Sequence, residues 1–430
     1  MIVLPKKVEL KNFISRNKIE LIIFGYFFLL EISFFAGYHY SYLRLPKKEP
    51  LKPFLGVVEN EATVSAEVAA AEVKVTKEET EIQEEPNSPQ PQWSPPPSQS
   101  SGQALFSTFP TWGTPNNKFG MYINADPKQI AEVASLINSN GGAWGWVLVP
   151  MDVRQRDHNL WQNIFNACRT HRVKPVIQLF NNNTCDVNEM DFPGLAEFLN
   201  ELSWPTKHLY ISVFNEVNAV YYWCGRKAPE EYAAVLNTAI DAFKSVNPNF
   251  FIMPAGFNSS ARSGPRYLDE EDYLLRMNAA VPGIFKKIDG WATHAYPQPE
   301  FSGDFYNPPS WYGVRDQIEN YKWEMGLLQK HFGVSGLPIF ITETGWAHRE
   351  GNSPMTPLQT ANYKPASVTA HYFDDAYRNH WLPNNQIVAI MPFVWYKSDA
   401  LHFNWKKEDG TFYPQYDIVT RFPKVAGTDD

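Results

Sequence analysis

The sequence predicts an α/β protein of the (β/α)8 TIM-barrel class, preceded by an N-terminal transmembrane helix and a disordered linker. From residue 118 onward, short hydrophobic runs alternate with longer amphipathic segments, which is typical of βα units on a parallel sheet. Eight such runs fit into about 280 residues, the number and size expected of one barrel. A doubly wound open sheet is the alternative, but no glycine-rich phosphate loop follows the first run, Phe119–Ile123.

The first element is an almost unbroken apolar segment at residues 21–38. As a helix it spans about 27 Å, close to the hydrocarbon thickness of a bilayer. Glu31 interrupts it, and a charge near mid-membrane is costly unless it is neutralised or paired. Basic residues flank both ends, so the charge bias favours a cytoplasmic N-terminus only slightly. We interpret residues 1–48 as a cytoplasmic N-terminus and signal anchor, with a cleaved signal peptide or a buried core helix as alternatives.

Residues 49–115 are expected to form a disordered acidic and Pro-rich stalk. Its acidic part, residues 58–85, carries nine Glu against two Lys. Residues 87–102 are rich in Pro, Ser and Gln, so they cannot bury a core and prefer extended conformations. The stalk would hold the barrel domain, residues 116–430, off the membrane. We therefore expect a single-pass protein of the cell membrane whose monomeric barrel domain is extracytoplasmic.

Composition narrows the choice of partner. The chain has a net charge of −8 and 15% aromatic residues, so a polyanionic partner such as nucleic acid is not expected. Aromatic rings suit a neutral carbohydrate, whose C–H faces stack on them. The three cysteines show no metal-ligand spacing, so the sequence indicates neither a metal site nor a cofactor.

The barrel domain is expected to contain eight strands and seven intervening helices. In the second helix, Trp161, Ile164, Phe165 and Cys168 recur at the spacing of a helix face packed on a sheet. The strands are expected at Phe119–Ile123, Gly145–Pro150, Pro175–Leu179, Leu209–Phe214, Phe250–Pro254, Gly290–His294, Pro338–Thr342 and Ile387–Trp395. The helices are expected at Lys128–Ser139, Leu160–Arg172, Pro193–Leu202, Pro229–Val246, Asp269–Lys287, Val314–Phe332 and Ala366–Asn379.

Two glutamates stand where predicted strands end. The pair Asn215-Glu216 follows the fourth strand, and Glu343 follows the seventh. A carboxyl group at the C-terminal end of a barrel strand points to the active-site mouth. Other Asn-Glu pairs, such as Asn60-Glu61 and Asn188-Glu189, occur in polar segments, so position carries the signal and the dipeptide alone does not. A structural salt bridge is the alternative for either glutamate alone, but their joint placement favours a functional pair.

Strands six and eight contribute further candidates. His294 and Tyr296 are two residues apart, so on a strand they share a face and can address the same pocket. The predicted eighth strand ends at Trp395, which is expected at the mouth. The alternatives are a structural histidine and ordinary core packing of the indole.

Together these segments resemble clan A of the glycoside hydrolases, a large group of retaining (β/α)8 enzymes. The resemblance covers roughly residues 118–405 and looks closest to the cellulase-like family 5 and neighbours such as family 39. The sequence departs from family 5 by lacking an arginine on strand two and a histidine at strand three. The matching residues are Asn215, Glu216, His294, Tyr296, Glu343 and Trp395.

The resemblance implies a role for each matching residue. Glu216 corresponds to the general acid/base and Glu343 to the nucleophile. Asn215 corresponds to the residue that hydrogen-bonds the sugar 2-hydroxyl, Tyr296 to the hydroxyl that holds the nucleophile, and His294 to a neighbour of the acid/base. The tryptophan at strand eight corresponds to the aromatic floor beneath the sugar.

Further aromatic residues follow the strand ends and are expected to include walls of a sugar-binding site. Tyr221, Tyr222 and Trp223 follow the acid/base, Trp346 follows the nucleophile, and Trp405 lies past strand eight. Some of these rings will instead belong to the core.

Two cysteines fall in adjacent loops at the predicted barrel mouth. Cys185 follows strand three and Cys224 follows strand four, so we predict a disulfide between them, in keeping with an oxidising exterior. Cys168 is left as a buried helical thiol.

These features predict a membrane-anchored retaining glycosidase, an O-glycosyl hydrolase acting on a β-linked poly- or oligosaccharide by double displacement. Two carboxyl groups about 5 Å apart push each other's pKa values apart, so one site can supply an acid and an ionised nucleophile. The alternatives are a catalytically silent carbohydrate-binding or adhesion domain and a transglycosylase that uses the same residues.

Overall fold

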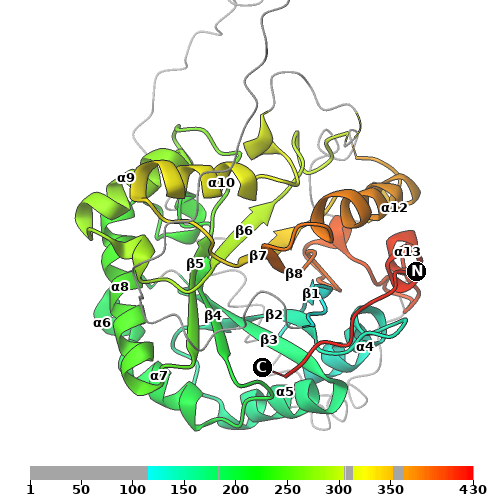
Figure 1. The fold of residues 1–430 in the computed structure, drawn as a ribbon, viewed down its shortest axis with the longest axis horizontal. Coiled ribbons are helices and arrows are strands. Elements are labelled where there is room, and N and C mark those ends of the chain that lie inside the picture. Colours follow the sequence, from blue (N-terminus) through cyan, green and yellow to red (C-terminus); the bar gives the residue numbers. More distant parts are fainter. Residues whose placement is uncertain (1–114, 183, 305, 307–312, 352–362, 430) are drawn as a thin grey trace, which may run out of the picture. The chain divides into compact units, whose positions relative to one another are not determined.

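The computed structural model describes residues 115–182, 184–304, 306, 313–351 and 363–429 (Figure 1). All of them belong to the compact unit formed by residues 101–430. The predicted anchor at residues 21–38 and nearly all of the predicted stalk lie outside the described residues. Within the described ranges, the structure has no helix with both the length and the apolar character needed to cross a bilayer.

The described unit is built on eight parallel strands. Strands β1 to β5 form one sheet and β6 to β8 a second, each in sequence order. Backbone contacts continue across both seams: the amide of Asp289 donates to Ile252 between β5 and β6, and that of Tyr122 donates to Pro392 between β8 and β1. The strands are β1 (Gly120–Tyr122), β2 (Gly145–Asp152), β3 (Val173–Phe180), β4 (Leu209–Asn215), β5 (Phe250–Gly256), β6 (Trp291–Ala295), β7 (Ile339–Thr344) and β8 (Ile387–Ile390).

Helices surround the strands (Figure 1). Aspartate side chains cap several of them, as Asp126 does for α4 and Asp157 for α5, by accepting a bond from a first-turn amide. The α-helices are α4 (Pro127–Ile137), α5 (His158–His171), α6 (Val187–Met190), α7 (Phe192–Glu201), α8 (Pro229–Val246), α9 (Glu270–Ala280), α10 (Tyr321–Leu327), α12 (Ala366–Asp375) and α13 (Pro414–Thr420).

Alternation along the strands divides the buried side chains between two cores. In β2, Trp146 and Leu148 enter an inner cluster, whereas Val147 and Val149 pack outward against the helices. The inner cluster also takes rings from β4, β5 and β7, as when Trp146 meets Phe340 edge to face at 5.4 Å. A packed interior surrounded by a second apolar layer is the arrangement expected of a barrel-like α/β fold.

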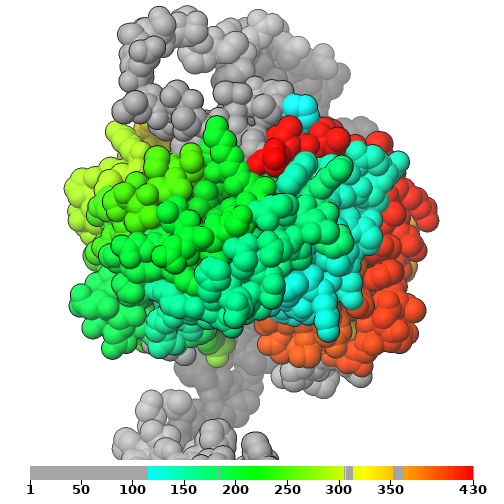
Figure 2. Space-filling model, turned by 90° about the horizontal axis from the view of Figure 1, so that it is seen from below, coloured from blue at the N-terminus to red at the C-terminus, as the bar shows by residue number. Residues whose placement is uncertain are grey.

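The two ends of the described unit meet on its surface. Figure 2 shows the C-terminal residues, in red, beside the first βα unit, in cyan. Ser139 donates its hydroxyl to the carbonyl of Thr420 at 3.0 Å, and Asn140 donates its side-chain amide to Arg421 at 2.8 Å. The end of the last helix, α13, therefore packs against the first βα unit.

The strand predictions are accurate to within a few residues except at β8. That strand ends at Ile390, five residues before the predicted end at Trp395. Pro392 lies in the segment predicted as strand, and proline has no amide hydrogen to donate to a ladder. The helix expected at Val314–Phe332 is divided into a short 3-10 turn (Val314–Asp316), α10, and a π-helical turn (Leu328–Phe332) that ends where the prediction did. Helix α13 was not predicted.

Candidate active site

Two carboxylates mark the C-terminal ends of β4 and β7. Glu216 follows the last residue of β4, and Glu343 is the last residue but one of β7. Their side chains keep 14% and 12% of their surface exposed, so both are largely buried but reachable from solvent. The predicted placement of these two glutamates at strand ends is therefore observed.

His294 lies between the two carboxylates. Its Nδ1 donates to Oε1 of Glu216 at 3.1 Å and lies 3.8 Å from Oε2 of Glu343. These two oxygens can therefore be no farther apart than the sum of the two distances. One imidazole, supplied by β6, thus brings the ends of β4 and β7 into a single polar group.

The position of His294 depends on its backbone and on a glycine. The pairing of β6 with β7 shifts register between Thr293 and His294, an irregularity that re-aims side chains. Asn320 donates its side-chain amide to the carbonyl of His294 at 3.0 Å. On the other side the ring packs directly over Gly256, the last residue of β5, where a Cβ would collide with it. Neither Asn320 nor Gly256 was identified from the sequence.

Tyr296 holds the second carboxylate. Its hydroxyl donates to Oε2 of Glu343 at 3.0 Å, while its ring packs edge to face on Phe301 at 5.0 Å. His294 and Tyr296 therefore address the same group, as their two-residue spacing predicted.

The end of β4 has unusual backbone geometry. Phe214 and Glu216 have φ values of 76° and 36°, a left-handed region that non-glycine residues rarely occupy. Such strained residues persist only where the surrounding structure stabilises them, and they cluster at functional sites. Between them, Asn215 accepts a bond from the side chain of Gln178 at 3.0 Å, which turns its amide nitrogen to the opposite side.

The electrostatics of the group reflect competing effects. Burial lowers the pKa of His294, but the charges of Glu343 and Glu216 outweigh it, and the net direction is upward. Burial raises the pKa of Glu343, and the charge of Glu216 raises it further, against the opposing effects of His294 and Tyr296. The arrangement therefore favours a protonated imidazole between the acidic groups.

The structure differs from the expectation for Trp346 and Trp395. Trp346 is 2% exposed and donates its indole nitrogen to the carbonyl of Gly303. Trp395 is fully buried and donates to Glu132 of α4 at 2.8 Å. Because β8 ends before it, Trp395 leaves the strand ends and packs toward the helical layer. These two indoles are core residues and do not join the carboxylate group.

Other aromatic residues take positions beside the carboxylates. Phe393 is only partly buried, and its amide donates to the carbonyl of Thr344, the residue after Glu343. Its ring meets Tyr122 edge to face at 5.0 Å. Burial raises the pKa of Tyr122, and the charge of Glu343 raises it further. Neither ring was identified from the sequence. To choose Phe393 over Trp395 as the ring beside the strand ends, one must know that β8 ends at Ile390.

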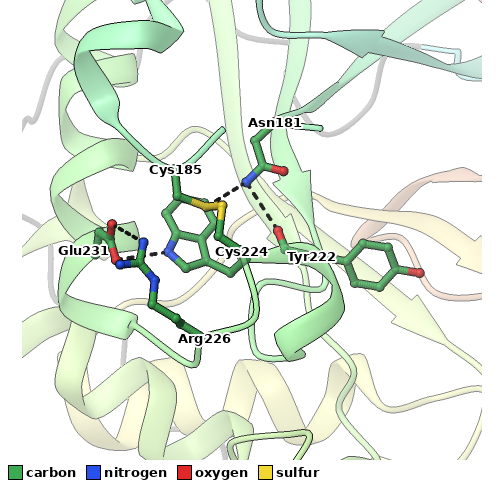
Figure 3. The surroundings of a disulfide bond; sticks show 7 residues. Asn181, Cys185, Tyr222, Cys224, Arg226 and Glu231 are labelled. Carbon is green, nitrogen blue, oxygen red and sulfur yellow. Dashed lines mark hydrogen bonds and ion pairs between the residues drawn. A yellow bond between two sulfur atoms is a disulfide. The ribbon is translucent and has the colours of Figure 1, made fainter. Parts of the chain in front are cut away.

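The predicted disulfide is present. Cys185 and Cys224 are joined, and Cys168 is a buried free thiol. Beside the bridge, Asn181 donates to the carbonyl of Tyr222 at 3.3 Å, while the ring of Tyr222 points away from the sulfur atoms (Figure 3). Within the described residues, no cluster of His, Cys, Asp and Glu has the form of a metal site.

No protein-family model and no curated protein matches this chain by sequence. Solved structures do. A glucosidase from Croceicoccus marinus is similar with a TM-score of 0.50 and 9% identity, over 72% of this chain and 67% of that one. A GH128 subgroup II endo-β-1,3-glucanase from Pseudomonas viridiflava is similar with a TM-score of 0.45 and 15% identity, over 72% and 99% of the two chains. Thermotoga maritima Cel5A is similar with a TM-score of 0.42 and 13% identity, over 70% and 97%.

At such low identity, the likeness to the glucosidase bears on the fold alone. Glycoside hydrolases are among the solved structures that the chain is similar to. Neither family 5 nor family 39 is singled out.

Proposed function

We propose that the barrel domain is a retaining glycoside hydrolase that cleaves β-linked poly- or oligosaccharides by double displacement. One observation carries the proposal: His294 contacts Glu216 and lies 3.8 Å from Glu343, which also accepts a hydrogen bond from Tyr296. Two partly exposed carboxylates on different strand ends, held by an imidazole and a phenol, are the groups that glycosidic cleavage requires.

The contacts of His294 limit the distance between the two carboxylates, which bears on the choice between retention and inversion. Retaining enzymes place the two groups about 5–5.5 Å apart, whereas inverting enzymes leave about 6.5–9.5 Å to admit a water molecule. Contacts of 3.1 and 3.8 Å from the same Nδ1 admit the closer arrangement and exclude most of the wider range, which favours retention as the proposal.

In the proposed reaction, Glu216 donates a proton to the glycosidic oxygen while the carboxylate of Glu343 attacks the anomeric carbon. The bond from that carbon to the departing oxygen breaks, and a covalent glycosyl–Glu343 ester forms. Glu216 then removes a proton from water, which attacks the same carbon and releases Glu343 as a carboxylate. His294 and Tyr296 hold the two carboxyl groups in place, and the hydrogen bond from Tyr296 stabilises the ionised form of the nucleophile Glu343.

The test measures hydrolysis across a panel of polysaccharides and aryl glycosides. Glu343→Gln should reduce turnover by more than about 10³-fold while sugar binding survives, because only the nucleophile is lost. Glu216→Gln should impair substrates with poor leaving groups far more than activated aryl glycosides. Proton NMR of the first product reports its anomeric form. Inverted product, or full activity of Glu343→Gln, would overturn the proposal.

We further propose that residues 21–38 anchor the chain in the cell membrane with the barrel domain outside. The Cys185–Cys224 disulfide supports an oxidising location for that domain. Protease added to intact cells should then remove the barrel domain from the full-length chain. A barrel that is protected until the cells are lysed would contradict this orientation.

A further inference from the structure

Three tyrosines outside the carboxylate–imidazole group lie on the segments that follow β4 and precede α9. Tyr221 and Tyr222 belong to a 3-10 turn after β4 (Val220–Tyr222), and Tyr267 precedes α9. Tyr221 is 53% exposed and Tyr222 38% exposed. Tyr221 meets Tyr267 edge to face, with ring centroids 6.2 Å apart. Trp223, the next residue, is fully buried, so exposure in this turn is confined to the two tyrosines.

The backbone that carries these rings is fastened at several points. Ala219 pairs with Tyr267 in an antiparallel bridge, and the amide of Val220 donates to Arg266 at 2.9 Å. The disulfide ties Cys224 to the loop after β3, and Asn181 holds the carbonyl of Tyr222 (Figure 3). The exposed rings are therefore presented in a defined geometry, which lowers the entropic cost of binding a ligand.

The backbone that carries the rings starts beside Glu216, because the amide of Ala219 donates to the carbonyl of Glu216 at 2.8 Å and Ala219 pairs with Tyr267. Burial raises the pKa of Tyr267, and the charge of Glu216 raises it further. Burial also raises the pKa of Tyr222, followed by the charge of Glu216 and then that of Glu343. In double displacement the acid/base stands beside the departing oxygen. Whatever is attached to that oxygen therefore leaves toward Glu216.

We propose that Tyr221, Tyr222 and Tyr267 form the binding surface for a leaving-group sugar, so that the substrate is a chain of sugars and not a glycoside of a small alcohol. Aromatic side chains combine a large apolar face with a hydroxyl that can hydrogen-bond, which suits the mixed surface of a pyranose ring. The inference rests on the proposed function, because the leaving-group side is defined by the role of Glu216.

The experiment compares two kinds of substrate. The first is a series of laminari- and cello-oligosaccharides from the disaccharide to the hexasaccharide, and the second is the 2,4-dinitrophenyl β-glucoside, whose leaving group needs no sugar-binding surface. Tyr221→Ala combined with Tyr267→Ala should lower kcat/KM on the cleaved oligosaccharides by about ten-fold or more, which corresponds to about 1.4 kcal/mol of lost contact. Hydrolysis of the aryl glucoside should change by less than about two-fold.

Two controls separate ring contact from general disturbance. Tyr221→Phe and Tyr267→Phe keep the ring faces and should retain most of the activity on oligosaccharides. Leu275→Ala removes an exposed apolar side chain on α9, away from the turn, and should leave both substrates unaffected. Equal loss on both substrates in the alanine variant, or no loss on oligosaccharides, would overturn the inference.

Calorimetric binding of the same oligosaccharides to Glu343→Gln distinguishes this inference from the proposed function. Suppose that the wild type shows no hydrolysis, while Tyr221→Ala and Tyr267→Ala each weaken oligosaccharide binding by about ten-fold. The proposed hydrolysis is then wrong, and the tyrosine surface is supported as a sugar-binding site. If binding is unchanged by the tyrosine substitutions, the surface is wrong whether or not hydrolysis occurs.

Discussion

At the scale of single residues, His294 is positioned both by hydrogen bonds and by the space that Gly256 leaves for its ring. Its ring lies over Gly256, where no Cβ fits, and its Nδ1 reaches Glu216 from there. Gly256 also accepts a backbone bond from the amide of Glu216 at 2.9 Å, so one residue sets the position of both partners. The glycine thus acts on the carboxylates through the imidazole.

Gly256→Ala is expected to push the imidazole away from Glu216 and to impair catalysis more than folding. Overpacking of this kind costs about 1–3 kcal/mol of stability, which a domain of this size should tolerate. We expect kcat/KM to fall by about ten-fold or more, because the contact between His294 and Glu216 is lost. Kinetics and thermal unfolding of the same preparation measure the two effects.

Gly326→Ala supplies the matched control, because a Cβ at this position in α10 meets nothing. It should keep full activity and gain slightly in stability, as alanine favours the helix. Wild-type kinetics in Gly256→Ala would show that the histidine does not need its present position.

At the scale of elements, the pattern of apolar residues located all eight strands but did not give the C-terminal boundary of β8. Seven strands start and stop near their predicted limits, because each is bounded by polar or turn residues. The run after Ile387 stays apolar through Trp395, although the strand ends at Ile390. With the strand extended to Trp395, that side chain was placed at the mouth. In the structure it is instead Phe393 whose amide contacts Thr344, the residue after Glu343.

The disulfide joins two neighbouring loops, and we expect its loss to affect substrate binding as well as stability. The double variant Cys185→Ser with Cys224→Ser should lose about 2–4 kcal/mol of unfolding free energy, since the bridge closes a loop of 39 residues. It should also raise KM for oligosaccharides, because the turn that carries Tyr221 and Tyr222 is no longer tied to the loop after β3. Denaturant unfolding and steady-state kinetics measure these effects.

Treatment with dithiothreitol provides the internal comparison. Reduction should bring the wild type toward the double variant and leave the variant itself unchanged. A reductant effect of equal size on both proteins would assign the change to something other than this bridge.

At the scale of the whole molecule, the sequence predicted the fold class and the strand-end carboxylates because both follow from local patterns. Glu216 and Glu343 were expected to meet because the C-terminal ends of parallel barrel strands share one mouth, and the two-residue spacing joined His294 to Tyr296. Gly256, Asn320 and Phe393 were out of reach, since their contacts come from other strands and loops and leave no periodic signal. Tryptophans were misjudged for a related reason: the same residue type serves the core and the sugar-binding surface.

Folding of the barrel also buries two acidic side chains that take no part in the proposed reaction. Glu270 at the start of α9 and Glu324 in α10 are both fully buried. Burial raises the pKa of Glu324 to about 7. Burial raises the pKa of Glu270 as well, and the charge of Glu324 adds to this. The fold therefore holds protons at these sites that the unfolded chain releases at lower pH.

This difference predicts that stability falls as pH rises from about 4.5 to about 7, because the folded state must give up protons that it binds more tightly than the unfolded state does. Glu324→Gln stays neutral throughout, so its unfolding free energy should exceed that of the wild type increasingly across this range. The gain amounts to about 1.4 kcal/mol for each unit by which the pKa is raised. Titrating groups other than Glu270 are common to both proteins and cancel in the comparison, whereas the pKa of Glu270 loses the contribution from the charge of Glu324. Glu197→Gln, on the exposed face of α7, should follow the wild type. Urea unfolding of the three proteins at a series of pH values measures the difference, and parallel curves for Glu324→Gln and the wild type would show that this carboxyl group titrates normally in the fold.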